Sequence, residues 1–210
     1  MPTTESIHFR HGMFPPDLPA NAAPAGTKGR ILESALVAFA ERGFHGTSIR
    51  TIADGASINS ATLYSHFASK EHILSELVSI GSHELLARLQ ADLVDVTGSA
   101  ARLDAIVAAT VRAHASFPLL AVVTNGEFSA LSRDLAGPAV APTAEASELL
   151  RVTLEEGITD GTFDVPNLRV TARLIEGMAQ QIPHWLTPAD DPEELVREYV
   201  VLARRIAGNA

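Results

Sequence analysis

Residues 44–74 constrain the fold of this chain more than any other segment, because helix starts follow one another there at short intervals. Thr47 is a residue type that caps helix N-termini. The apolar side chains that follow, Ile49, Ile52 and Ala53, recur at the spacing of one helical face. The pattern ends in a Gly-Ala-Ser run that favours a tight turn. The segment therefore opens with a short helix that ends abruptly.

A second short helix is predicted after that turn, and its outer face is polar. Asn59 is a second cap residue, and Leu63 and Phe67 supply the buried side. Ser69 then caps a long third helix whose first turn contains Lys70. Short donors and acceptors with one phenol are suited to a DNA major groove, where they can touch base edges and phosphates. The outward side chains of this kind are Ser60, Thr62, Tyr64, Ser65 and His66.

This arrangement resembles the DNA-binding head of the TetR family of transcriptional regulators. About 50 residues carry the resemblance, including Gly29 to Gly43, which is similar to the family's first helix. Ser57 stands where the family usually has glycine, so the turn requires a serine that adopts a nearly left-handed backbone, at a cost of about 1 kcal/mol. The matching residues are Thr47, Ile52, Ala53, Ala56, Ile58, Asn59, Ala61, Thr62, Leu63, Tyr64, His66, Phe67, Ser69 and Lys70.

The resemblance implies that the protein binds double-stranded DNA at a pseudo-palindromic operator. Phosphate contacts are expected from Thr47, Tyr64 and Lys70, whereas shorter side chains such as Ser60 and Thr62, together with the imidazole of His66, approach the bases. The full predicted DNA-binding set is Thr47, Ser48, Arg50, Asn59, Ser60, Ala61, Thr62, Tyr64, His66 and Lys70.

The remainder of the chain predicts helices throughout, and we expect an all-α fold of about nine helices. Apolar residues recur at threes and fours between Lys70 and Val96, and no strand-like alternation competes. Residues 1–26 contain five prolines and no helical period, which predicts a flexible N-terminal arm. Arg10 of this arm, with His8 and His11, can reach a minor groove; an inert tail is the alternative. The predicted units are the arm 1–26, a helix-turn-helix domain 27–75, and a ligand-binding and dimerisation domain 76–210.

Charge is divided unevenly along the chain, whose net charge is −9. Residues 27–75 carry five cations against four anions, whereas residues 76–210 carry ten against nineteen. The acidic part is therefore expected to face away from DNA. Because residues 27–75 are nearly neutral, they neutralise few phosphates, which predicts modest non-specific affinity for DNA and a shallow salt dependence of binding.

The two final predicted helices, about 167–183 and 192–207, carry more apolar surface than one core face needs. The family resemblance implies that they pack against the same helices of a second subunit, so that a homodimer places its recognition helices in successive major-groove faces. Packing on the helix between 70 and 96 is the alternative. The residues concerned are Val170, Leu174, Ile175, Met178, Ile182, Leu195, Val196, Tyr199, Val200, Leu202, Ala203 and Ile206.

The helices in between are expected to enclose a mostly apolar cavity for a small-molecule effector. A similarity of the last 45 residues to regulators of lipid or steroid breakdown implies an acyl thioester or another lipophilic compound. In the family's mechanism, the effector shifts the helix between 70 and 96 and spoils the half-site spacing. Each candidate liner has an ordinary core or surface role as its alternative. The candidates are His83, Leu86, Gln90, His114, Phe117, Val122, Asn125, Phe128, Leu154, Met178, Gln181 and Trp185.

Patterns for catalysis, metals and membranes are weak or absent in the sequence. The chain has no cysteine, which excludes disulfides and thiolate metal sites, and it has no His-x-x-x-His pair and no Gly-x-Ser-x-Gly motif. No run of 18 apolar residues occurs. We therefore expect a cytoplasmic repressor, released from its operator by a mostly apolar molecule, without catalytic residues, metals or cofactors. The alternatives are a helical protein-interaction adaptor and a small-molecule enzyme.

Overall fold

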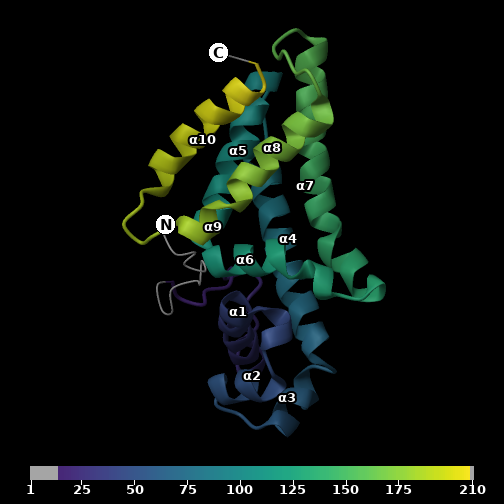
Figure 1. Ribbon diagram of the computed structural model, residues 1–210, viewed down its shortest axis with the longest axis vertical. Coiled ribbons are helices and arrows are strands. Elements are labelled where there is room, and N and C mark those ends of the chain that lie inside the picture. Colours follow the sequence, from purple (N-terminus) through teal and green to yellow (C-terminus); the bar gives the residue numbers. More distant parts are fainter. Residues whose placement is uncertain (1–13, 209–210) are drawn as a thin grey trace, which may run out of the picture.

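The computed structural model describes residues 14–208, where all regular structure is helical (Figure 1). Within this range, nine α-helices have seven or more residues, which confirms the predicted all-α class. The expectations for His8, Arg10 and His11 lie outside the described residues. The elements are α1 (Thr27–Gly46), α2 (Ile49–Gly55), α3 (Ser60–His66), α4 (Lys70–Asp92), α5 (Ser99–Ser116), α6 (Pro118–Gly126), the 3-10 helix η1 (Phe128–Ala130), α7 (Arg133–Thr159), α8 (Leu168–Gln180), the single-turn α9 (Ile182–Trp185) and α10 (Pro192–Ile206).

Helices α1 to α3 and the first half of α4 form a head around one hydrophobic cluster. Two of the predicted caps are confirmed: the Asn59 side chain accepts the N–H of Thr62 at 2.8 Å, and Ser69 accepts the N–H of His72 at 3.3 Å. These caps satisfy backbone donors that the first turn of a helix leaves without partners. The fully buried cluster residues include Ile31, Leu32, Leu36, Ile52, Leu63, Ile73 and Leu77.

The cap of α2 is Ser48, and the prediction of Thr47 in that role is wrong. Ser48 Oγ accepts the N–H of Thr51 at 3.0 Å. Thr47 is only 2% exposed, and its hydroxyl lies 2.9 Å from the carbonyl oxygens of both Ala38 and Gly43. Because the end of α1 needs donors for its free carbonyls, the Thr47 side chain turns inward and the next residue caps α2.

Helix α4 belongs to two hydrophobic clusters and connects them. Its first half, including Leu74 and Leu77, lies in the head cluster, and its second half contributes Leu86 and Leu89 to a cluster with α5, α7, α8, α9 and α10. Figure 1 shows α4 running from the head into the body, with α6 lying across the junction. No single helix within residues 14–208 is long and apolar enough to span a membrane. Helices α5 and α6 reach that length and apolar content only when they are counted together, and the chain bends by 107° between them.

The segment before α1 is packed rather than free in its described part. Leu18 is buried in the head cluster, and Phe14 packs against both clusters. A Cβ atom at Gly29 would collide with the carbonyl oxygen of Pro24, so the chain lies directly against α1 there. Residues 14–26 thus differ from the expected flexible arm, because two apolar anchors outweigh their proline-rich composition.

Ser57 adopts the left-handed backbone that the sequence predicted for this turn, with a φ of 56°. Its N–H donates to the carbonyl of Asp54 at 3.1 Å, so the strained residue closes the turn between α2 and α3. The side chain is exposed and gains no hydrogen bond that would offset the strain.

We expect Ser57→Gly to raise the free energy of unfolding by about 0.5–1 kcal/mol and the melting temperature by about 1–4 °C, because glycine removes the Cβ strain at positive φ. Thermal unfolding followed by circular dichroism measures this change. The matched control is Ser65→Gly within α3, which should destabilise the protein by about 0.5 kcal/mol. A lower melting temperature for Ser57→Gly would contradict the strain assigned to this turn.

Candidate functional site

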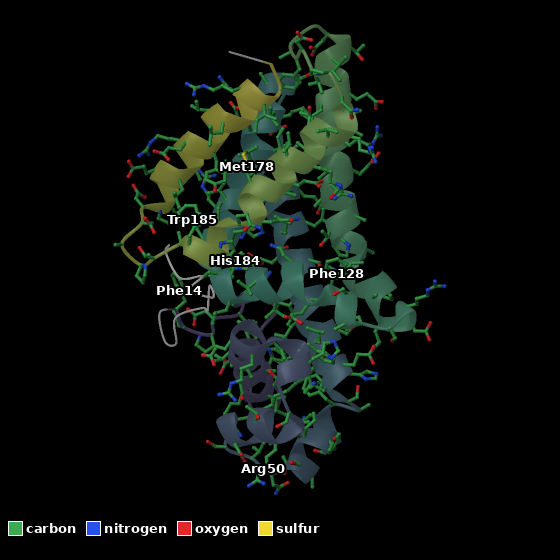
Figure 2. The ribbon with its side chains drawn as sticks, in the orientation of Figure 1. Phe14, Arg50, Phe128, Met178, His184 and Trp185 are labelled. Atoms are coloured by element: carbon green, nitrogen blue, oxygen red, sulfur yellow. The ribbon has the colours of Figure 1, made fainter. Side chains whose placement is uncertain are left out.

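The outward side of α2 and α3 collects most of the predicted DNA-binding residues at one end of the molecule. Tyr64 is 54% exposed although it is a large aromatic residue. Arg50 lies at the outer tip of the head (Figure 2), and its side chain is 88% exposed. The other exposed or half-buried members of this face are Ser48, Asn59, Ser60, Ala61, Thr62, Ser65 and His66. Such a face combines hydroxyl, amide, phenol and imidazole groups, the types that contact bases and phosphates.

Lys70 does not point freely toward this face. Its ammonium donates to the carbonyl oxygens of Phe44 at 2.6 Å and Thr47 at 2.7 Å, and it lies 4.1 Å from the centroid of the Phe44 ring. Partial burial lowers the pKa of Lys70. Two of its three N–H donors are therefore used within the head, and the predicted phosphate contact depends on the third. The sequence prediction missed this internal role because the two carbonyls belong to a turn more than twenty residues away.

Phe44 is held from two sides at the end of α1. The helix is kinked at Gly43, whose φ of 70° favours glycine. The N–H of Phe44 donates to a carboxylate oxygen of Glu127 at 3.1 Å, while its carbonyl accepts from Lys70. Glu127 caps the C-terminus of α6, and Lys70 begins α4. Phe44 therefore connects the end of α1 both to the start of α4 and to the end of α6.

Few head cations remain for DNA once the internal contacts are counted. Lys28 Nζ lies 2.5 Å from a Glu76 carboxylate oxygen, and Arg30 donates to the carbonyl of Ala56 at 3.3 Å. Arg50 has only a 3.7 Å contact with Asp54, and both side chains are highly exposed, so this pair adds little stability. Arg42 of α1 is exposed as well, but Arg50 belongs to the α2–α3 face and is therefore the cation best placed to meet a phosphate there.

An apolar cavity lies in the body between α4, α5, α6, α7 and α8. Two of the predicted liners, His114 and Asn125, are on its wall. A smaller neighbouring cavity shares these two residues and adds Phe117, a third predicted liner, together with Thr124. The first cavity is lined by Leu85, Leu89, Ile106, Val107, Thr110, His114, Asn125, Thr143, Ala146, Ser147, Leu150, Ile175, Glu176, Ala179 and Gln180.

The remaining predicted liners do not face either cavity. Phe128 and Trp185 are exposed and lie on different flanks of the molecule (Figure 2). Helix phase is the physical reason, since one residue along a helix turns a side chain by about 100°. Thus Gln180 lines the cavity whereas Gln181, the next residue, does not. Exposed residues outside the cavities are His83, Gln90, Phe128, Gln181 and Trp185; Leu86, Leu154 and Met178 pack in the second cluster, and Val122 is half-buried elsewhere.

A helix-turn-helix head joined to a helical body with an internal apolar cavity defines a ligand-responsive DNA-binding regulator. The chain belongs to the tetR family of bacterial regulatory proteins. Residues 31–77 match the family described as bacterial regulatory proteins, tetR family, and residues 97–207 match the tetracyclin repressor-like C-terminal domain. Within residues 14–208, no group of three or more His, Asp or Glu side chains is placed to hold a metal ion.

Several relatives are similar along most of their length. The chain is 30% identical to the HTH-type transcriptional repressor KstR2 of Rhodococcus jostii over 187 residues, covering 84% of this chain and 87% of that protein. A solved tetR-family regulatory protein from Rhodococcus RHA1 has a TM-score of 0.81 at 27% identity, covering 89% of this chain and 100% of that chain. The ketosteroid transcriptional regulator KstR2 of Mycobacterium tuberculosis has a TM-score of 0.80 at 26% identity, covering 89% and 97%.

Lys70→Ala should lower both the melting temperature and the affinity for DNA, because it removes charge-assisted bonds that are each worth about 1.5–3 kcal/mol and that fix the head. The matched control is Arg50→Ala, which should leave the melting temperature unchanged, weaken binding to all sequences alike and flatten the salt slope by about one unit. Calorimetry measures the melting temperature of each variant. A salt series of binding to a DNA fragment selected by the wild-type protein measures the affinity and the salt slope. An unchanged melting temperature for Lys70→Ala would contradict its positioning role.

Proposed function

We propose that this regulator is a homodimeric repressor that leaves its operator when a mostly apolar small molecule enters the cavity of the body. One observation carries the proposal: the cavity wall includes Leu85 and Leu89 of α4, the helix whose first residue, Lys70, anchors the head. A ligand that prefers a shifted α4 therefore also prefers a shifted head, which is the differential affinity that coupling between two sites requires.

The cavity is narrow in this conformation, and this supports a coupled expansion. Its volume is only about 60 Å³. A ligand of more than a few atoms must spread the helices around it, because packed side chains leave little other free space. Helix α4 is one of those walls, so ligand entry displaces it.

The relatives support both parts of the proposal. The relative from Rhodococcus jostii, which is 30% identical, carries the name of a transcriptional repressor, and the solved relative from Mycobacterium tuberculosis is called a ketosteroid regulator. The cavity of this chain is lined mainly by Leu, Ile, Val and Ala, which suits a lipophilic effector. An adaptor that binds only protein would not require the exposed polar face of α2 and α3.

Exposed apolar side chains on α8 and α10 support the dimer. Val170 and Leu174 of α8 and Val201 and Leu202 of α10 are all exposed in the single subunit. Several other predicted seam residues face their own core instead: Ile175, Ile182, Leu195, Val196 and Ala203 are buried. We assign the seam to the exposed set, since contiguous exposed apolar residues mark contact surfaces. Val196, placed in the seam by the sequence, belongs to the core.

Leu174→Glu should give a folded monomer that binds its operator weakly, because a dimer would have to bury an unpaired carboxylate. The control is Val94→Glu, at a residue that is 66% exposed in the turn after α4 and should leave assembly unchanged. Sedimentation equilibrium and a gel shift measure assembly and operator binding. A wild-type monomer that is fully active at micromolar concentration would exclude the proposed dimer.

The effector should weaken operator binding by about 5- to 150-fold, and operator DNA should weaken effector binding by the same factor. A gel shift with and without a ketosteroid or an acyl thioester, together with calorimetric titration, tests this reciprocity. Ser147→Phe should abolish the response by filling the cavity from α7 while operator binding persists. Loss of operator binding by this variant, while it remains folded, would refute the separation of the two sites.

A further inference from the structure

Three hydrogen-bonding side chains meet where the two cavities adjoin. His114 of α5 and Asn125 of α6 line both cavities, and Thr124 of α6 lines the smaller one. Thr143 also lines both cavities, but its hydroxyl already donates to Ser82 Oγ at 2.9 Å, so a polar group placed there has few free partners other than these three. The chemistry of this cluster determines which polar group of a ligand it can accept.

The ring of His114 presents a lone pair at Nε2. His114 is 6% exposed, and its Nδ1 lies 2.9 Å from the carbonyl oxygen of Ala179. A carbonyl oxygen only accepts, so Nδ1 carries the hydrogen and Nε2 is the acceptor. Burial lowers the pKa of His114 to about 4, which keeps the ring neutral near pH 7. Asn125 Nδ2 is 3.4 Å from Nε2, longer than a well-formed bond, so this acceptor is only weakly satisfied.

Thr124 supplies an unused hydroxyl on the smaller cavity, which His114 also lines. Its Oγ1 is buried and has no hydrogen-bond partner. A Cβ atom at Gly81 would collide with this oxygen, so the hydroxyl lies against the bare backbone of α4. Thr110, on the wall of the larger cavity, behaves differently: its hydroxyl donates to the carbonyl of Ile106 at 2.8 Å. The lack of a partner at Thr124 is unfavourable for stability and therefore calls for an explanation.

The charged residues around the two cavities leave no partner for an ionised group of a ligand. Neither cavity is lined by Lys or Arg. The two lining carboxylates are already paired, Glu84 with Arg88 at 2.6 Å and Glu176 with Arg173 at 3.0 Å. A carboxylate buried beside His114 would have no cation to compensate for its lost hydration.

We propose that the cluster of His114, Thr124 and Asn125 is a subsite for a neutral hydroxyl group of the effector. The hydroxyl donates to His114 Nε2 and accepts from the hydroxyl of Thr124, so both unsatisfied groups gain a partner. A ketone oxygen at the same place accepts from Thr124 but leaves Nε2 without a donor. This inference rests on the proposed function of the larger cavity, which holds the apolar body of the same molecule.

Calorimetric titration of the full-length protein with three probes of similar length tests the subsite. The probes are 1-octanol, 2-octanone and methyl heptyl ether, all narrow and unbranched in shape. We expect 1-octanol to bind about tenfold more tightly than the ether, a difference that corresponds to about 1.4 kcal/mol, with the ketone in between. Equal affinities for the alcohol and the ether would overturn the subsite and leave the effector cavity in place. Failure of all three to bind would overturn both.

Variants separate the subsite from a merely structural role. Thr124→Val and His114→Phe should each bring the alcohol-to-ether preference close to one. Thr110→Val, on the wall of the larger cavity, is the matched control and should keep the tenfold preference, because its hydroxyl is already bonded. Thr124→Val should also raise the melting temperature of the free protein, since it removes a buried hydroxyl without a partner. A tenfold preference retained in Thr124→Val would overturn the assignment, whether or not His114→Phe folds.

Discussion

The attachment of the head to the body centres on Phe44, whose backbone bonds to Lys70 at the start of α4 and to Glu127 at the end of α6. The end of a helix leaves carbonyl groups without intrahelical donors, and here the ammonium of Lys70 supplies donors to the carbonyls of Phe44 and Thr47. The N–H of Phe44 donates to Glu127 from the other side. Because α4 and α6 contact the same residue, any displacement of either helix relative to the other is transmitted to the end of α1, and from there to α2 and α3.

Helix α6 serves both halves of the protein, which explains why the boundary between them is not a break in packing. Leu120 and Val123 face the head cluster, whereas Asn125 faces the cavity. Helix α4 is divided in the same way along its length. Since packed interiors deform little, a ligand that widens the cavity has to move shared helices as units. The proposed coupling between effector binding and head orientation therefore rests on the sharing of two helices.

Two polar groups on the cavity walls lower the stability of the protein because they lack good hydrogen-bond partners. A fully satisfied interior would bond the Thr124 hydroxyl and the His114 lone pair, yet one has no partner and the other has a long contact of 3.4 Å. Sites prepared for a ligand often keep polar groups that only the ligand satisfies. The strain at Ser57 has a different character, because it lies in an exposed turn and involves only the backbone.

Local chemistry in the sequence was sufficient to determine the helical class and the caps Asn59 and Ser69, because each depends on neighbours within a few residues. The left-handed turn at Ser57 was predicted from the family resemblance, since the family usually has glycine there. Only the tertiary structure decided the inward rotation of Thr47 and the internal bonds of Lys70, because their partners lie on other elements. The same holds for the cavity. His114 and Asn125 lie on its wall whereas Gln181 does not, since the rotation of each helix about its axis is set by packing between helices rather than by the residues along one of them.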